Sequence, residues 1–353
     1  MLTVLVRQLP TAPIIRWSLN PKSDIYIEWE MPNKRIDFSD INLIPRKGVV
    51  ESRSECSTLT MLGTHTFELP IVPANMECVI NDEIAERLAA SGFFYIHHRF
   101  NTDAVSFTRR MKTSYLPTSI SIGVNKDAYD TLRALLSEGL YPEFITIDIA
   151  HGHSVKMEAI IKWIRANFTA EQPYIIAGNV STGSAVYDLE EWGADAIKVG
   201  IGPGSACTTY VATGFGSRGA QAAVVAECAE ARTNPNTKII ADGGIKEPGD
   251  IAKALTLGAD MVMIGGMFSA LKDSPGATVK GTDGQLYKEF WGSASAFQSG
   301  KKNRIEGTKK LLPLKHHTIL EELNYIKECL QSAISYGGGD DLTCFKDVQY
   351  FWI

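Results

Sequence analysis

The sequence predicts a single α/β domain folded as a (β/α)8 barrel, also called a TIM barrel. From about residue 70 onward, short apolar runs rich in β-branched residues alternate with longer segments of helical pattern, which is typical of parallel βαβ units. About eight such runs occur, and eight is the number that closes a barrel. A doubly wound sheet that binds a dinucleotide would need an early G-x-G-x-x-G turn, which we do not find.

The elements follow one another in strict alternation. Several predicted helices stop at a glycine, where a left-handed cap costs little. Strands are predicted at Ile71–Ala74, Phe93–Ile96, Ser119–Ile122, Phe144–Ile147, Tyr174–Ala177, Ala196–Val199, Lys238–Ala241 and Met261–Ile264. Helices are predicted at Asn81–Ala90, Ala128–Gly139, Ser154–Asn167, Ser184–Gly193, Ala220–Arg232 and Pro248–Gly258. Two segments, Trp-Gly-Ala-Asp-Ala-Ile-Lys-Val-Gly and Leu-Gly-Ala-Asp-Met-Val-Met-Ile-Gly-Gly, look alike because each ends a helix and opens a buried strand.

Composition excludes several classes of protein. The chain has 353 residues, 44% hydrophobic and 21% charged, enough to bury a large core. A net charge of -5 argues against a nucleic-acid binder, although backbone amides can still hold a phosphate. No apolar run approaches the roughly 20 residues that span a bilayer, so we expect no membrane partner. Six scattered cysteines without a C-x-x-C pair predict a cytoplasmic location.

Residues 1–30 form a leader of uncertain status ahead of a catalytic domain at 31–353. The leader holds Arg7 and Arg16 and no acidic residue before Asp24, a pattern that faintly resembles a transit peptide. The alternatives are an unstructured leader, or a start site placed too early with Met31 as the true beginning. Within the domain we expect a flap near residues 295–312 and a helical C-terminal segment.

In a barrel, the chemistry belongs to the loops at the carboxyl ends of the strands. Asp148 ends the fourth predicted strand, and Cys207 lies in the loop after the sixth. Asp242-Gly243-Gly244 follows the seventh strand and Gly265-Gly266 the eighth, where this fold often binds phosphate. A lone Gly-Gly is usually only a turn, but two pairs after these two strands favour a phosphate site.

The segment from Val199 to Thr209 carries three glycines and a proline just before Cys207, which indicates a tight loop that approaches a ligand closely. Together with Pro73-Ala74-Asn75-Met76, Ile147-Asp148-Ile149-Ala150-His151-Gly152-His153, Ala177-Gly178-Asn179, Ala241-Asp242-Gly243-Gly244-Ile245 and Ile264-Gly265-Gly266-Met267, it resembles the inosine monophosphate dehydrogenase and GMP reductase family. The resemblance runs from about Ile36 to the C-terminus.

Two absences favour the reductase branch of that family. The dehydrogenases usually carry a pair of CBS modules after the second strand, and only about twenty residues separate His98 from Ser119. They also use an Arg-Tyr pair on a mobile flap to activate water, and this sequence contains no Arg-Tyr dipeptide. The segment Asn303-Arg304-Ile305-Glu306-Gly307 is similar to the reductases instead.

The resemblance implies a reaction in which a cysteine thiolate adds to carbon 2 of GMP, ammonia leaves, and NADPH delivers hydride to give IMP. It implies that Cys207 is the nucleophile and that Thr209 and Glu306 pass a proton to the ammonia. It further implies a homotetramer. The remaining implied contacts are Asn75, Asp242, Gly243, Gly244, Gly265, Gly266 and Ser293 for GMP, Asp148, Ala150 and His151 for the cofactor, and Gly202, Gly204 and Cys207 for a monovalent cation such as K+.

Other interpretations remain open from the sequence. A compact IMP dehydrogenase would oxidise IMP to XMP with NAD, and a noncatalytic barrel would only bind a nucleotide. Asp148 is equally placed to cap the following helix. Lys301, Lys302 and Arg304 belong either to a solvated flap or to a contact with the extra phosphate of NADPH.

Overall fold

The computed structural model describes residues 15–19, 25–29, 36–300 and 305–353. Two compact units result, Met1–Arg35 and Ile36–Ile353. In the first unit, β1 (Ile15–Leu19) pairs antiparallel with β2 (Ile25–Trp29). The rest of the predicted leader and the basic run at 301–304 lie outside the described residues.

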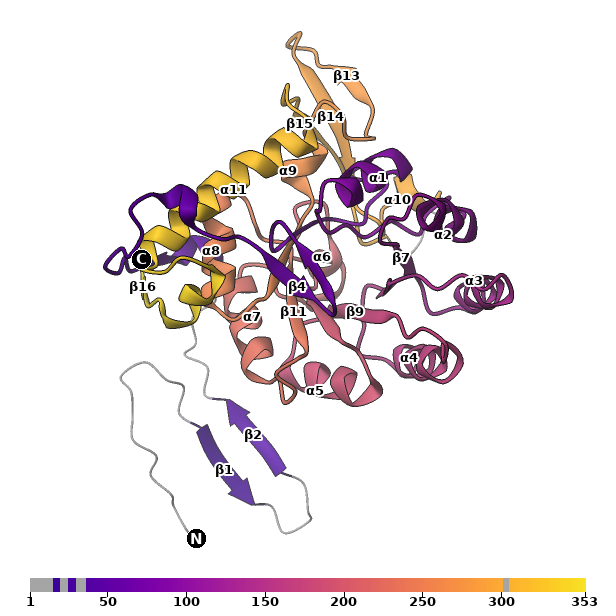
Figure 1. The fold of residues 1–353 in the computed structure, drawn as a ribbon, viewed down its shortest axis with the longest axis horizontal. Coiled ribbons are helices and arrows are strands. Elements are labelled where there is room, and N and C mark those ends of the chain that lie inside the picture. The colour runs from indigo at the N-terminus through magenta and orange to yellow at the C-terminus, as the bar shows by residue number, and fades with distance from the viewer. Residues whose placement is uncertain (1–14, 20–24, 30–35, 301–304) are drawn as a thin grey trace. The chain divides into compact units, whose positions relative to one another are not determined.

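The second unit is built around a curled sheet of seven parallel strands in the order β6-β12-β11-β10-β9-β8-β7 (Figure 1). These strands correspond to seven of the eight predicted ones, so the barrel class is confirmed. Their bounds are β6 Ile71–Pro73, β7 Ser119–Ile122, β8 Phe144–Asp148, β9 Tyr174–Val180, β10 Ala196–Val199, β11 Lys238–Asp242 and β12 Met261–Ile264.

The predicted strand at Phe93–Ile96 is not a regular strand. Only His97 forms a bridge to β7, at Ile120, and its N–H donates to the Ser119 carbonyl at 3.1 Å. The N–H of Ser119 donates to the hydroxyl of Tyr95, also at 3.1 Å. A side-chain oxygen therefore takes the place of a ladder carbonyl, and the chain between β6 and β7 forms no regular strand.

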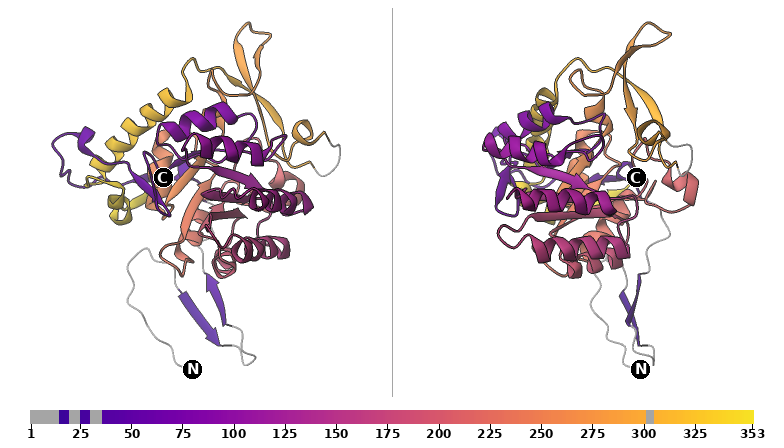
Figure 2. Two further views of the ribbon diagram at one scale, coloured as in Figure 1. Left: turned by 45° about the vertical axis from the view of Figure 1, so that its right-hand side comes forward. Right: turned by 90° about the vertical axis from the view of Figure 1, so that its right-hand side faces the viewer.

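Helices surround this sheet as the sequence predicts (Figure 2). Their N-termini are capped by short polar side chains, including Asn81, Ser154 and Thr182, whose oxygens accept from backbone N–H groups. The helices are α1 Asp82–Ala90, α2 Ala104–Thr113, α3 Lys126–Ser137, α4 Val155–Asn167, α5 Gly183–Trp192, α7 Gln221–Glu230 and α8 Pro248–Thr256. The sequence reasoning missed α2, whose buried face is only Phe107, Thr108 and Met111.

Side chains alternate along each strand between the barrel interior and the layer beneath the helices. In β9, for example, Ile176 belongs to the interior cluster, whereas Ile175 and Ala177 belong to the outer one. The hairpin of β4 (Thr60–Leu62) and β5 (His65–Phe67) adds Leu62 and Phe67 to the interior cluster. The barrel is a packed core rather than a pore.

The two similar Gly-Ala-Asp segments have the same structural role. Asp195, just before β10, accepts from the N–H of Ile175 at 2.6 Å and from Arg165 at 2.5 Å. Asp260, just before β12, accepts from the N–H of Ile239 at 2.9 Å and from an arginine of the preceding segment, Arg232, at 2.6 Å. Each aspartate therefore joins the start of its neighbouring strand to an arginine, Arg165 within α4 or Arg232 just beyond α7.

The C-terminal part contains the segment near residues 295–312 that the sequence predicts as a flap, and we refer to this segment as the flap. An antiparallel sheet of β13 (Thr278–Lys280), β14 (Leu286–Trp291) and β15 (Lys309–Pro313) projects from the barrel, with α10 (Ala296–Ser299) after β14 (Figure 1). Next come α11 (Ile319–Tyr336), which packs on α8, and β16 (Tyr350–Trp352), which pairs with β3 (Ile41–Leu43). Short 3-10 helices lie at Phe38–Asp40, Arg53–Glu55 and Leu342–Asp347. Among the described residues, no helix has the length and apolarity needed to cross a membrane.

Candidate active site

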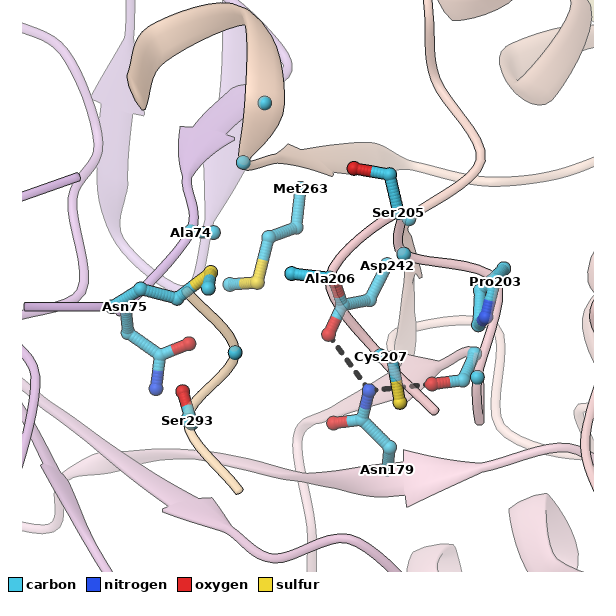
Figure 3. Close-up of a pocket in the computed structure, with 18 of the residues that line it drawn as sticks. Ala74, Asn75, Asn179, Pro203, Ser205, Ala206, Cys207, Asp242, Met263 and Ser293 are labelled. Atoms are coloured by element: carbon cyan, nitrogen blue, oxygen red, sulfur yellow. Dashed lines mark hydrogen bonds between the residues drawn. The ribbon is translucent and has the colours of Figure 1, made fainter. Parts of the chain in front are cut away.

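A cavity of about 800 Å³ opens where the parallel strands end. Its wall is made by the loops after β6, β8, β10, β11 and β12 together with the flap. Figure 3 shows Asn75 and Ser293 on one side of the cavity and the loop of Pro203, Ser205 and Cys207 on the other. A volume of this size is typical of a site for a small organic ligand with its cofactor.

Cys207 lies at the base of the loop that follows β10. Its backbone N–H donates to the carbonyl of Gly204 at 3.0 Å, which closes a tight turn just before the thiol. The chain then enters the short helix α6 (Thr209–Thr213), so the thiol stands at the junction of loop and helix. Its Sγ is 3.2 Å from Oγ1 of Thr209, close enough for a hydrogen bond.

The flap brings a carboxylate to this pair. The hydroxyl of Thr209 donates to Oε2 of Glu306 at 2.6 Å. Main-chain contacts fix the flap there, because the N–H of Thr208 donates to the Glu306 carbonyl at 2.8 Å and Cys207 forms an antiparallel bridge with Gly307. The result is a continuous contact from thiol to hydroxyl to carboxylate, joining residues 99 positions apart in the chain.

A buried lysine pairs with two carboxylates of the cavity wall. Nζ of Lys198, in β10, lies 2.8 Å from Oδ1 of Asp148 and 2.8 Å from Oδ2 of Asp242. Burial by itself would raise the pKa of Asp148, but the Lys198 charge more than offsets it, so this pKa lies below its usual value. Burial would likewise lower the pKa of Lys198, and the two carboxylates raise it instead. Asp148 and Lys198 therefore stay ionised at neutral pH.

Backbone with positive φ follows β11. Gly243 and Gly244 have φ of +89° and +85°, a region that residues with a Cβ rarely adopt. A Cβ on Gly243 would also lie 3.0 Å from the backbone nitrogen of Gly204, in the cysteine loop. Gly265 and Gly266 lead from β12 into the short helix α9 (Gly266–Ser269) and line the same cavity. Both predicted glycine pairs thus reach the cavity with exposed backbone.

A model of the "IMP dehydrogenase / GMP reductase domain" matches residues 35–352. The chain belongs to that family. Proteins named GMP reductase are similar to it along nearly their whole length. One from Lactococcus lactis subsp. cremoris (strain SK11) is 50% identical over 319 residues, 90% of this chain and 95% of the relative. Those from Mesoplasma florum and Clostridium acetobutylicum are 48% and 49% identical over 314 and 315 residues, which is 89% of this chain and 96% and 94% of the relatives.

Most residues that the family resemblance singled out line this one cavity. His151 is the exception, because it is exposed and does not contribute to the wall. The residues that do line the cavity are Asn75, Asp148, Ala150, Gly202, Gly204, Cys207, Thr209, Asp242, Gly243, Gly244, Gly265, Gly266, Ser293 and Glu306.

The sequence reasoning missed three polar residues of the cavity. Lys198 had a visible signal, since a charged residue in the apolar strand Ala-Ile-Lys-Val must find a partner. Asn179 was seen only as part of a motif, but its amide donates to the Gly200 carbonyl at 2.6 Å and to Asp242 at 2.7 Å (Figure 3). Arg99 had no signal, because the loop that carries it follows the irregular segment Phe93–Ile96.

Proposed function

We propose that this chain is a GMP reductase, which converts GMP to IMP and ammonia at the expense of NADPH. The observation that carries the proposal is the contact from Cys207 through Thr209 to Glu306 at the edge of a nucleotide-sized cavity. A nucleophile, a proton carrier and a carboxylate are the groups that displacement of an amine requires. A barrel that only bound nucleotides would need none of them.

The first chemical step forms a bond from the sulfur of Cys207 to carbon 2 of the purine. The exocyclic amine then leaves as ammonia, and the proton that it needs comes from the relay of Thr209 and Glu306. A covalent thioimidate remains on Cys207. After carbon 2 has received a hydride, the carbon–sulfur bond breaks, and IMP leaves with Cys207 as a thiolate again.

The rest of the cavity fits a nucleotide monophosphate. Asp242 accepts from ribose hydroxyls, and the glycines after β11 and β12 present backbone N–H groups to the phosphate. Asn75 and Ser293, from the opposite wall, add polar contacts to the nucleotide. Buried polar groups of this kind reject a ligand that cannot pair with them.

The cavity also has room for a nicotinamide cofactor, because it continues from Cys207 to Asp148 and Ala150. Within the described part of the chain, Nε of Arg99 is buried and has no hydrogen-bond partner, although Arg99 lines the same cavity. A guanidinium whose buried Nε lacks a hydrogen-bond partner suits the phosphates of NADPH. When bound, the reduced nicotinamide supplies the hydride, and Asp148 and Ala150 orient it.

Carbonyl oxygens of Gly202, Gly204 and Cys207 are further proposed to hold a monovalent cation such as K+. Oxygen donors in a loop of positive φ suit such an ion, and Gly202 has a φ of +84°. We also propose a homotetramer in the cytoplasm. Light scattering that gives four times the mass of one chain, and faster turnover in K+ than in choline buffer, are the expected results.

The proposal is tested by incubating the purified chain with GMP and NADPH. We expect loss of reduced-cofactor absorbance together with equal amounts of IMP and ammonia. The C207A variant should bind GMP but not turn it over. No reaction with GMP, alongside reduction of NAD with IMP, would assign the chain to the dehydrogenase branch instead.

A further inference from the structure

Lys198 is the most completely buried charge in the cavity wall, with only 2% of its surface exposed. It joins two strands that contribute to different parts of the site. Asp148 ends β8 beside the region proposed for the nicotinamide, and Asp242 ends β11 beside the region proposed for the ribose. The side chain of Lys198 bridges them at 2.8 Å on each side.

The arrangement leaves a defined oxygen available on Asp242. Lys198 and Asn179 both donate to Oδ2, at 2.8 and 2.7 Å. Among the described residues, neither of these donors uses Oδ1, which stays available for donors in the cavity. Two fixed bonds to one oxygen also fix the plane of the carboxylate, so the direction of Oδ1 is set before any ligand binds.

The positive charge of Lys198 also offsets the repulsion between Asp148 and Asp242. Two carboxylates in a buried wall repel each other and lose hydration, a cost that a single amine can offset only by contacting both. Lys198 contacts both from β10, whose other residues are apolar and fully buried. Stabilising the fold does not by itself explain a buried ion pair here, because well-packed apolar residues in its place would stabilise the fold equally well.

We propose that Lys198 is a positioning residue that orients Asp242 toward the ribose and Asp148 toward the cofactor, and so sets the affinity of the site for both ligands. The proposal rests on the proposed function, since it takes GMP as the ligand that Asp242 meets. It assigns no contact between Lys198 and the reacting atoms. The lysine acts only through the two carboxylates.

The test compares K198A and K198Q with K238M, a matched control. Lys238 also pairs with an aspartate, Asp260, at 3.1 Å, but it lies at the other end of β11, away from the cavity. We expect K198A and K198Q to weaken GMP binding in calorimetry at least tenfold and to raise KM for GMP by a similar factor, with a smaller fall in kcat. K238M should bind GMP as the wild type does.

Chemical rescue separates positioning from folding. Ethylammonium ions should restore GMP binding to K198A, because the truncated side chain leaves space for them, but not to K198Q, whose side chain occupies that space. GMP affinity of both Lys198 variants within twofold of the wild type would overturn the proposal. So would ethylammonium that raises the melting temperature of K198A without improving GMP binding.

If neither single variant folds, the double variant K198M/D148N removes one positive and one negative charge together. It should still lose GMP affinity, whereas D148N alone should keep it, because Asp242 retains both Lys198 and Asn179 in D148N but only Asn179 in the double variant. Equal affinity of the two would refute the positioning role. Wild-type chain that binds no GMP would instead refute the proposed function.

Discussion

At the scale of single residues, the proposed chemistry depends on one chain of contacts. Cys207, Thr209 and Glu306 meet because main-chain pairing holds the flap against the cysteine loop. No other cysteine has such surroundings, since burial raises the pKa of Cys78 to about 11 and that of Cys228 further still. Those two thiols stay protonated at neutral pH and cannot serve as nucleophiles.

Replacing either partner of the relay should slow the release of ammonia. We expect T209V and E306Q each to lower kcat with GMP by about 10² to 10⁴, the range of general acid–base catalysis. The double variant should lose little more, because the two residues act as one relay. Steady-state kinetics measure this, and losses that multiply in the double variant would show that the two act independently.

The buried side chain of His98 should make the free energy of unfolding depend on pH. Burial, helped by the neighbouring His97, lowers the pKa of His98 from 6.5 to about 4, while its Nδ1 accepts from the N–H of Phe100 at 3.3 Å. The unfolded chain therefore binds a proton at higher pH than the folded chain. Stability should be fully present above about pH 6.5 and fall by about 3 kcal/mol as pH drops to about 4.

The variant H98N tests this assignment, because an amide oxygen can replace Nδ1 as acceptor without titrating. Urea unfolding at several pH values should show a shallower fall in the free energy of unfolding for H98N between pH 6.5 and 4. Identical slopes for the variant and the wild type would mean that other groups cause the acid sensitivity.

At the scale of elements, the flap is held by close main-chain approach. A Cβ on Gly307 would lie 3.0 Å from the nitrogen of Ser295 and 3.3 Å from Cα of Gly292, both backbone atoms. G307A should therefore push Glu306 away from Thr209 and lower kcat at least tenfold with little loss of stability. G249A, where a Cβ in α8 meets nothing, is the control. A fully active G307A would show that the flap tolerates a looser fit.

Asp195 and Asp260, which accept from backbone N–H groups at the starts of neighbouring strands, should contribute to the free energy of unfolding. Removing Asp195 leaves the N–H of Ile175 without its acceptor and takes the carboxylate partner from Arg165, which keeps its bonds to the Gly193 and Pro173 carbonyls. The loss should cost about 1–3 kcal/mol of unfolding free energy. D130A is a matched control, since Asp130 pairs with Lys126 on an exposed helix face, where solvent screens the pair and its removal should change stability little. Chemical denaturation measures the free energy of unfolding of D195A and D130A, and an equal loss in the two variants would contradict a structural role for Asp195.

At the scale of the whole molecule, the fold could be predicted because seven strands carry apolar residues on both faces and glycines follow their helices. The irregular course of Phe93–Ile96 could not be predicted, since its pairing involves the hydroxyl of Tyr95, a tertiary contact that leaves no periodic pattern. Local pattern likewise missed α2, a mostly polar helix with a narrow buried face.

The site could be predicted where chemistry leaves a local signature, as in the glycine-rich cysteine loop. Lys198 pairs with residues distant in sequence, and Arg99 lies in a loop without a sequence pattern, so only the folded geometry brings them to the cavity. His151 shows the opposite error. It lies inside a recognised motif, so the sequence predicted it for the site, but it does not line the cavity.

The most direct test of the central claim, covalent catalysis by Cys207 on GMP, is the intact mass of the chain after incubation with GMP alone. We expect a fraction of the chain to gain the mass of GMP less one ammonia, an adduct absent from C207A and discharged as IMP when NADPH is added. A chain that turns GMP over while no adduct forms on Cys207, or a C207A variant that stays active, would contradict the account.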